Sequence, residues 1–181
     1  MKQALVIIDV QKDYFLGGKL ELVGSDLALE KINLLEDAFL ARQWPIIYIQ
    51  HIKPDPKANF FAMGTTGADL HEGLRVQEDS RVIVKHFPNS FLQTELLSAL
   101  TGLGAERLVI AGMMTQMCVD STTRAARELG FQPLVISDAT ATRDLKFNNQ
   151  EVSAANVQLS FLSALETFAE IKTTKEFLQE L

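Results

Sequence analysis

The chain of 181 residues lacks the features of a membrane protein, a disulfide scaffold or a nucleic-acid-binding protein. No apolar run approaches the roughly 20 residues of a membrane-spanning helix, and a single cysteine excludes an intrachain disulfide. The net charge is -6, and the basic residues do not cluster, which argues against nucleic-acid binding. We therefore expect neither a membrane nor a nucleic acid among its partners.

The composition is that of an ordinary globular protein, with 47% hydrophobic and 22% charged residues. The length is enough to bury a core, and no repeat, low-complexity stretch or linker divides it. Residues 1–181 are thus predicted to form one domain. In the first residues, MKQALVIIDVQ, Asp9 interrupts the apolar run and no small-residue cleavage site follows. We read a strand there rather than a signal peptide, and expect a soluble, cytoplasmic protein.

Short apolar, β-branched runs alternate with helical patterns along the chain. This alternation predicts an α/β fold: a three-layer sandwich with a mostly parallel sheet and helices on both faces. Leu27, Ile32, Leu35, Phe39 and Leu40 are expected on the inner face of the first helix. Strands are predicted at 4–8, 46–50, 81–85, 107–111, 133–137 and 170–172, and helices at 25–42, 90–100, 116–129 and 148–168, with a short helix after 173.

The longest connection runs from Lys53 to Glu78 and contains two prolines and three glycines. Connections of this length are usually functional or disordered. Phe60, Phe61 and other apolar residues in it argue against simple disorder. We therefore expect a loop that folds over a substrate pocket or a neighbouring subunit.

Three chemically reactive residues lie at or just after strand ends. Asp9 ends the first predicted strand, Lys85 ends the third, and Cys118 follows the fourth by one turn. Taken alone, Asp9 fits a turn or cap, Lys85 a solvated charge, and Cys118 a small buried hydrophobe. Because parallel strands bring their carboxyl ends to one edge of the sheet, the three side chains are predicted to converge there.

This convergence predicts nucleophilic catalysis. Cys118 is expected in the first turn of a helix, where the helix dipole lowers a thiol pKa from its ordinary value of about 8.5. Asp9 would act as general base, and Lys85 would hold Asp9 ionised. Cys118 would attack an electrophilic carbon and form a covalent intermediate. The N–H of Cys118 and one from the preceding turn are candidate oxyanion donors.

Four segments resemble the isochorismatase-like cysteine hydrolases, a family that includes nicotinamidases and N-carbamoylsarcosine amidase. They read VIIDVQKDYF, VKHFPNSF, AGMMTQMCVDSTTRAARELGF and ISDATAT, and the resemblance covers nearly the whole chain. It implies a Cys118–Asp9–Lys85 triad and a six-stranded parallel sheet in the order 3-2-1-4-5-6. It also implies a cis peptide between Met113 and Met114, oxyanion binding by the N–H groups of Met114 and Cys118, and a homo-oligomer.

Two departures from relatives in the family narrow the expected chemistry. Isochorismatases that cleave a vinyl ether lack the nucleophile, so Cys118 favours hydrolysis of a C–N bond in a small amide, ureido or related substrate. Nicotinamidases carry an Asp-x-His metal motif after the second strand, whereas this chain reads Gln50-His51-Ile52-Lys53. We therefore predict no metal and no other cofactor. His51 is interpreted as a hydrogen-bonded structural histidine, with a substrate or loop contact as the alternative.

Several further residues are candidates for contact with a small-molecule substrate. Each also has a structural interpretation, either core packing or hydrogen bonding within a loop. Arg143 fits either a substrate carboxylate or a solvated loop position. Two other functions stay open: cleavage of another bond, such as a thioester or nitrile, and a catalytically silent, oligomeric binding protein. The candidate substrate contacts are Gln11, Phe15, Phe60, His86 and Phe87.

Overall fold

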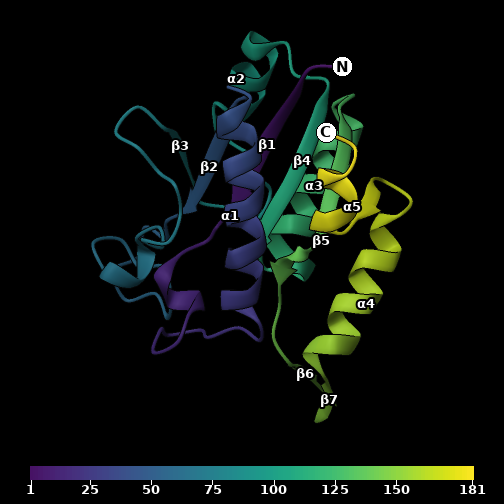
Figure 1. Cartoon of the computed structure of the whole chain (residues 1–181). Coiled ribbons are helices and arrows are strands. Elements are labelled where there is room, and N and C mark those ends of the chain that lie inside the picture. The colour runs from purple at the N-terminus through teal and green to yellow at the C-terminus, as the bar shows by residue number, and fades with distance from the viewer.

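A computed structural model describes all residues from Met1 to Leu181. Its central sheet consists of β1 (Gln3–Ile8), β2 (Ile46–His51), β3 (Arg81–Lys85), β4 (Arg107–Met113), β5 (Gln132–Ala141) and β8 (Glu170–Lys172). All neighbouring strands pair in parallel, in the order β3-β2-β1-β4-β5-β8 (Figure 1). The predicted order is confirmed, and the sixth strand lies at residues 170–172 as expected.

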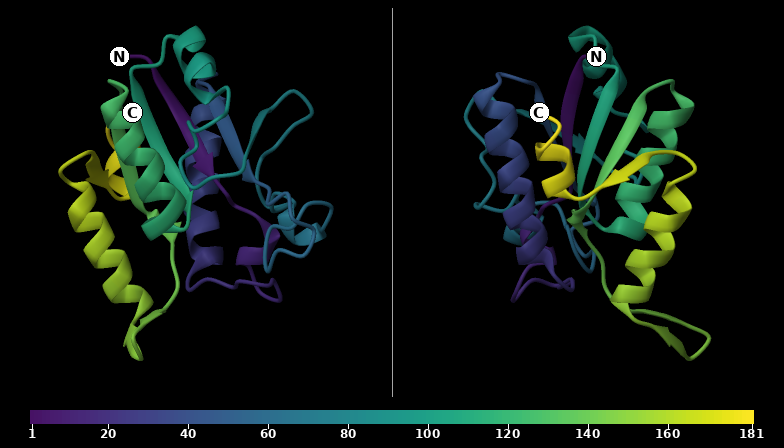
Figure 2. Two further views of the ribbon diagram at one scale, coloured as in Figure 1. Left: turned by 180° about the vertical axis from the view of Figure 1, so that it is seen from behind. Right: turned by 45° about the vertical axis from the view of Figure 1, so that its right-hand side comes forward.

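Five helices cover the two faces of the sheet (Figures 1 and 2): α1 (Ser25–Ala41), α2 (Leu96–Leu103), α3 (Asp120–Glu128), α4 (Ala154–Leu165) and α5 (Thr174–Leu178). Side chains of β1 alternate between two separate apolar cores, because successive residues of a strand point to opposite faces. Leu5 and Ile7 pack in the core under α1 and α5. Val6 and Ile8 pack in the core under α2 and α3. The predicted three-layer sandwich is thereby confirmed. None of the helices has the length and apolar character of a membrane span.

The predicted inner face of α1 is confirmed only in part. Ile32, Leu35 and Phe39 are fully buried, but Leu27 and Leu40 are 65% and 47% exposed. The buried stripe follows the helical spacing of three to four residues. Leu27 and Leu40 flank that stripe. They were predicted to be buried because they are apolar, but they lie outside the buried face.

The long helix predicted at 148–168 is shorter than expected. Residues before it form a separate antiparallel hairpin of β6 (Leu145–Phe147) and β7 (Gln150–Val152). Asn148 and Asn149 make its turn with φ of 48° and 61°, a left-handed conformation that asparagine tolerates in tight hairpins. Helix α4 begins only after Ser153, whose side chain accepts a hydrogen bond from the Asn156 N–H.

The ends of β1 and β4 approach so closely that one position requires glycine. Gly112 has a φ of 123°, and a Cβ there would lie 2.0 Å from the Ile8 carbonyl oxygen. The β4–β5 register shifts between Ile110 and Gly112, and this irregularity lets β5 continue to Ala141 instead of ending at Ser137 as predicted. The strand ends that carry the candidate site are thus packed against each other.

Candidate active site

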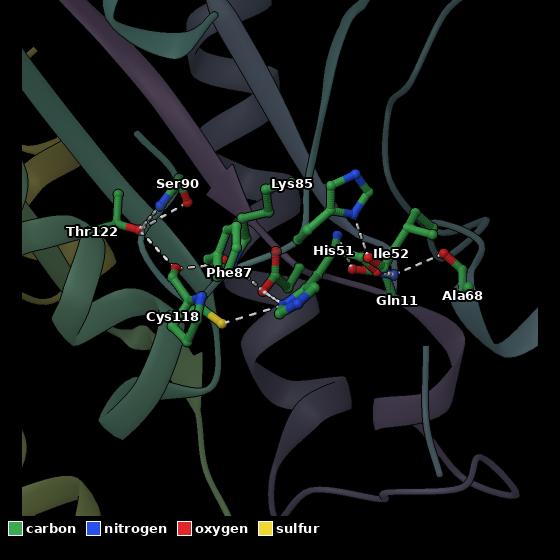
Figure 3. A network of polar contacts seen from close by, with 12 residues as sticks. Gln11, His51, Ile52, Ala68, Lys85, Phe87, Ser90, Cys118 and Thr122 are labelled. Atoms are coloured by element: carbon green, nitrogen blue, oxygen red, sulfur yellow. Dashed lines mark hydrogen bonds and ion pairs between the residues drawn. The ribbon is translucent and has the colours of Figure 1, made fainter. Parts of the chain in front are cut away.

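The structure brings the three predicted side chains together at the carboxyl edge of the sheet, where Figure 3 labels Lys85 and Cys118. Asp9 directly follows β1, Lys85 ends β3, and Cys118 lies in a π-helical turn, Thr115–Val119, between β4 and α3. Lys85 Nζ is 2.9 Å from Asp9 Oδ2, and both side chains are fully buried. Cys118 Sγ lies within 4.8 Å of the Asp9 carboxylate. A thiol, a carboxylate and an ammonium therefore share one water-poor site.

Asp9 has a strained backbone and a carboxylate that is held mainly by Lys85. Its φ is 51°, a left-handed conformation that non-glycine residues rarely adopt outside functional sites. Apart from the ion pair with Lys85, the carboxylate oxygens accept no hydrogen bond. Burial favours a higher pKa for Asp9, but the Lys85 charge and His51 outweigh it, so the pKa is lowered. Asp9 is therefore ionised at neutral pH and free to accept a proton.

Lys85 is fixed by three acceptors, which match the three N–H bonds of an ammonium. Besides Asp9, its Nζ donates to the carbonyl oxygens of Phe87 at 3.1 Å and Pro88 at 3.0 Å. Burial acts to lower the Lys85 pKa, but the Asp9 charge outweighs it and the pKa is raised. Lys85 thus remains a cation and holds the Asp9 carboxylate in place.

The expectation of a lowered Cys118 pKa is wrong. Burial raises the pKa of this thiol well above its ordinary value, and the charge on Asp9 adds to the effect, whereas Lys85 only partly opposes it. The side chain is 3% exposed, so loss of hydration outweighs any benefit from the start of the helix. The Cys118 side chain is therefore a neutral thiol at neutral pH.

His51 is a site residue that the sequence interpretation missed. Its Nδ1 lies 3.8 Å from Cys118 Sγ and 3.6 Å from Asp9 Oδ2. His51 ends β2 and pairs in register with Lys85. The rule that selected Asp9 and Lys85, a polar residue at the carboxyl end of a parallel strand, applies equally to His51 and would have identified it.

Asp9, His51 and Cys118 form a donor set that could hold a metal ion. Their ligand atoms all lie within 4.8 Å of one another, and carboxylate, imidazole and thiolate are the usual zinc ligands. However, the Lys85 ammonium already neutralises the Asp9 carboxylate from 2.9 Å away. A second cation at this place would be repelled by Lys85, so the donor set suits proton transfer better than metal binding.

The structure corrects the prediction that Gln11 contacts the substrate, because its side-chain amide is hydrogen-bonded to backbone groups of the chain. Gln11 Nε2 donates to the carbonyl oxygens of His51 and Ala68, both at 2.8 Å, and its Oε1 accepts from the His51 N–H at 2.8 Å (Figure 3). The side chain is fully buried. Gln11 therefore positions the backbone of His51, which is the loop-bonding alternative. Phe15 also serves the scaffold, because it is buried in the core with its ring 4.0 Å from that of His71.

The remaining candidate contacts lie around the site, and their role in substrate binding stays a prediction. His86 is exposed, and its Nδ1 lies 2.7 Å from the Ile52 carbonyl oxygen. Phe87 is 40% exposed and contributes its carbonyl to Lys85. Phe60 is half-buried, with Lys53 Nζ 3.3 Å from its ring centroid.

The long connection folds over the site of its own chain. We call residues 53–78 the cover loop. The Phe61 N–H donates to Asp13 Oδ2 at 2.7 Å, and the Phe61 ring is 5.9 Å from that of His51. A Cβ at Gly67 would lie 2.1 Å from Asp13 Oδ1, so the loop needs glycine to approach this carboxylate. The loop therefore contacts the site of its own chain, and a contact with a neighbouring subunit stays a prediction.

Comparison with known proteins agrees with this geometry. The family model for the isochorismatase domain matches residues 3–175. The chain is 40% identical to the uncharacterized isochorismatase family protein YddQ of Bacillus subtilis, over 99% of this chain and all of the relative. It is 27% identical to the ureidoacrylate amidohydrolase RutB of Klebsiella pneumoniae, over 92% of this chain and 85% of that protein.

Solved structures show the same fold. A hydrolase of the isochorismatase family from Oleispira antarctica superposes with a TM-score of 0.95 at 39% identity, covering 98% of this chain and 96% of that one. A cysteine hydrolase from Pseudomonas syringae gives a TM-score of 0.92 at 25% identity, covering 98% and 91%.

Fold and site together are those of a hydrolase with a parallel-sheet, three-layer architecture. The chain belongs to the isochorismatase family.

Proposed function

We propose that this protein hydrolyses a C–N bond of a small amide, ureido or related substrate through a covalent intermediate on Cys118. The observation that supports this most directly is the buried Asp9 carboxylate, which is ionised, is paired with Lys85 and lies within 4.8 Å of a neutral thiol. The similarity to an amidohydrolase and to a cysteine hydrolase supports the same bond class and nucleophile.

In the first half-reaction, Asp9 takes the Cys118 thiol proton as the sulfur attacks the carbonyl carbon and a C–S bond forms. The tetrahedral intermediate collapses when Asp9 gives that proton to the leaving nitrogen and the C–N bond breaks. In the second half-reaction, Asp9 takes a proton from water, which attacks the same carbon. The C–S bond then breaks, and Asp9 returns the proton to the sulfur.

The oxyanion of each tetrahedral intermediate needs preorganised donors. We propose the backbone N–H groups of Met114 and Cys118 for this role. Met114 directly precedes the π-helical turn that holds Cys118, and the Met113–Met114 peptide bond before it is cis. Lys85 acts on the reaction through Asp9, because its three N–H bonds are already used.

A substrate panel tests this proposal against its alternatives. Primary amides, N-carbamoyl acids, nitriles and thioesters are incubated with the wild type and with Cys118→Ala, and ammonia and acid release are measured. Ammonia release from amides or ureido compounds that is absent in Cys118→Ala supports the proposal. Turnover of thioesters or nitriles alone would assign another bond. No turnover by folded protein favours the binding-protein alternative. The homo-oligomer and the cytoplasmic location stay predictions, and light scattering tests the first.

A further inference from the structure

His51 differs from the other two histidines of the chain in what its ring contacts. His71 and His86 each place Nδ1 within hydrogen-bond distance of a backbone group, at 3.0 Å and 2.7 Å. The His51 ring has no backbone partner. Its Nδ1 lies 3.8 Å from Cys118 Sγ and 3.6 Å from Asp9 Oδ2, and neither ring nitrogen has another hydrogen bond or ion pair. A single nitrogen of a buried imidazole thus faces both the nucleophile and the base.

The scaffold holds this ring in place. The Gln11 amide binds both the N–H and the carbonyl oxygen of His51, each at 2.8 Å, and His51 pairs in register with Lys85. The His51 side chain is buried, with the Phe61 ring 5.9 Å away. Figure 3 shows the His51 ring next to the sulfur of Cys118. Proton transfer requires such a fixed position, because its rate depends steeply on the geometry of donor and acceptor.

A direct transfer of the thiol proton to Asp9 is uphill. Burial raises the pKa of the Cys118 thiol. Burial also favours a higher pKa for Asp9, but the Lys85 charge outweighs it and the pKa is lowered. The donor is thus a weak acid and the acceptor a weak base. An imidazole is ordinarily more basic than a carboxylate and less basic than a thiolate, so a histidine between the two divides the transfer into smaller steps.

We propose that His51 carries the Cys118 proton to Asp9 and back. The resting imidazole bears its hydrogen on Nε2, so Nδ1 presents a lone pair to the thiol. The S–H bond breaks as Nδ1 takes the proton, and the N–H bond then breaks as Asp9 Oδ2 takes it. The reverse transfer restores the thiol at the end of the second half-reaction. Catalytic hydrogen bonds often shorten from such distances once substrate is bound. This inference rests on the proposed function and adds a catalytic residue to it.

Two variants separate proton transfer from hydrogen bonding. His51→Asn places an amide atom where Nδ1 lies, so it keeps a hydrogen-bonding group but carries no proton at neutral pH. His51→Ala removes the whole ring and leaves space for free imidazole. We expect kcat for the hydrolysed amide to fall about 100-fold in both variants, with KM little changed. Added imidazole should raise the kcat of His51→Ala about tenfold and leave His51→Asn unchanged, because the asparagine fills the space.

Alkylation of Cys118 by iodoacetamide measures the same proton transfer without any hydrolysis. A C–S bond forms, iodide leaves, and the thiol proton passes to His51. At neutral pH the rate should fall about tenfold in His51→Asn and in His51→Ala, and imidazole should restore only His51→Ala. His71→Asn is the matched control, since it removes a histidine whose Nδ1 accepts a hydrogen bond from the Gly73 N–H instead. This control should leave both kcat and the alkylation rate unchanged.

Wild-type kcat and alkylation in His51→Asn would overturn the proposal, because a hydrogen-bonding group alone would then suffice. A loss in His51→Ala that imidazole does not reverse would show a structural role and overturn it as well. Where His51→Ala does not fold, His51→Asn decides, and its kcat must fall at an unchanged midpoint of thermal unfolding. A kcat loss that only follows the loss of folded protein would count against proton transfer.

The two measurements also separate this inference from the proposed function. Amide hydrolysis at the full rate in His51→Asn would remove the role of His51 and keep the hydrolase. Alkylation that depends on His51 or on imidazole, without turnover of any substrate by the wild type, would keep proton transfer from Cys118 and remove the hydrolase.

Discussion

Lys85 Nζ lies 2.9 Å from Asp9 Oδ2, and neither side chain is accessible to solvent. A buried ion pair of this kind adds little net stability, because both charges lose their hydration. Its value lies in function, since it keeps an ionised carboxylate beside a buried thiol. Removing one partner leaves the other charge buried and unpaired, so both stability and chemistry depend on the pair.

Lys85→Met should therefore lower the free energy of unfolding by about 3–5 kcal/mol and strongly reduce activity. Urea unfolding measures the first effect. The double variant Asp9→Asn/Lys85→Met should be less destabilised than Lys85→Met, because no lone buried charge remains. A double variant as unstable as the sum of the two single variants would show that the charges are not coupled.

The lowered pKa of Asp9 predicts a pH dependence of stability. Because the folded-state pKa lies below the ordinary value of about 3.9, ionised Asp9 stabilises the fold above that value. This contribution is lost as the pH falls through the folded-state pKa. The free energies of unfolding of the wild type and of Asp9→Asn should thus converge toward acid pH. Parallel curves between neutral and acid pH would contradict a lowered Asp9 pKa.

The raised pKa of Cys118 predicts that thiolate absorbance forms only at alkaline pH, above the ordinary cysteine value of about 8.5. Ultraviolet titration measures it as the difference between the wild type and Cys118→Ala, because the two tyrosines also ionise at alkaline pH. Asp9→Asn should lower the midpoint, because one negative charge near the sulfur is removed. Thiolate already present at neutral pH in the wild type would instead support the lowered Cys118 pKa that the sequence predicted.

Thr122 should support catalysis by holding the turn that binds Lys85. Its Oγ1 donates to Ser90 Oγ at 2.8 Å and accepts from the Ser90 N–H at 3.0 Å (Figure 3). Thr122→Val should cost about 1–3 kcal/mol of stability and lower kcat more than it changes KM, and Thr122→Ser should restore both. Thr123→Val is the matched control, since the Thr123 hydroxyl is buried without a partner. An equal loss of kcat in Thr123→Val would show that the hydrogen bonds between Thr122 and Ser90 do not support catalysis.

Local patterns in the sequence predicted the strands and the convergence of Asp9, Lys85 and Cys118, because strand ends are marked by apolar runs that stop at polar residues. The sheet order was implied by the family resemblance. Other features depend on tertiary contacts. The Cys118 pKa is set mainly by burial, not by the start of its own helix. Gln11 looks like a substrate contact until its amide is seen to bind the backbone of His51. The hairpin turn at Asn148 and Asn149 interrupts a pattern that was otherwise helical.

The central claim is a covalent intermediate on Cys118, and intact-protein mass spectrometry after rapid acid quenching tests it most directly. With a slowly hydrolysed amide or ureido acid, the wild type should gain the mass of the acyl or carbamoyl group, located on Cys118 by peptide mapping. Cys118→Ala should gain none, and Asp9→Asn should form the adduct much more slowly. Turnover with no adduct under any quenching time, or full activity in Cys118→Ala, would contradict the account.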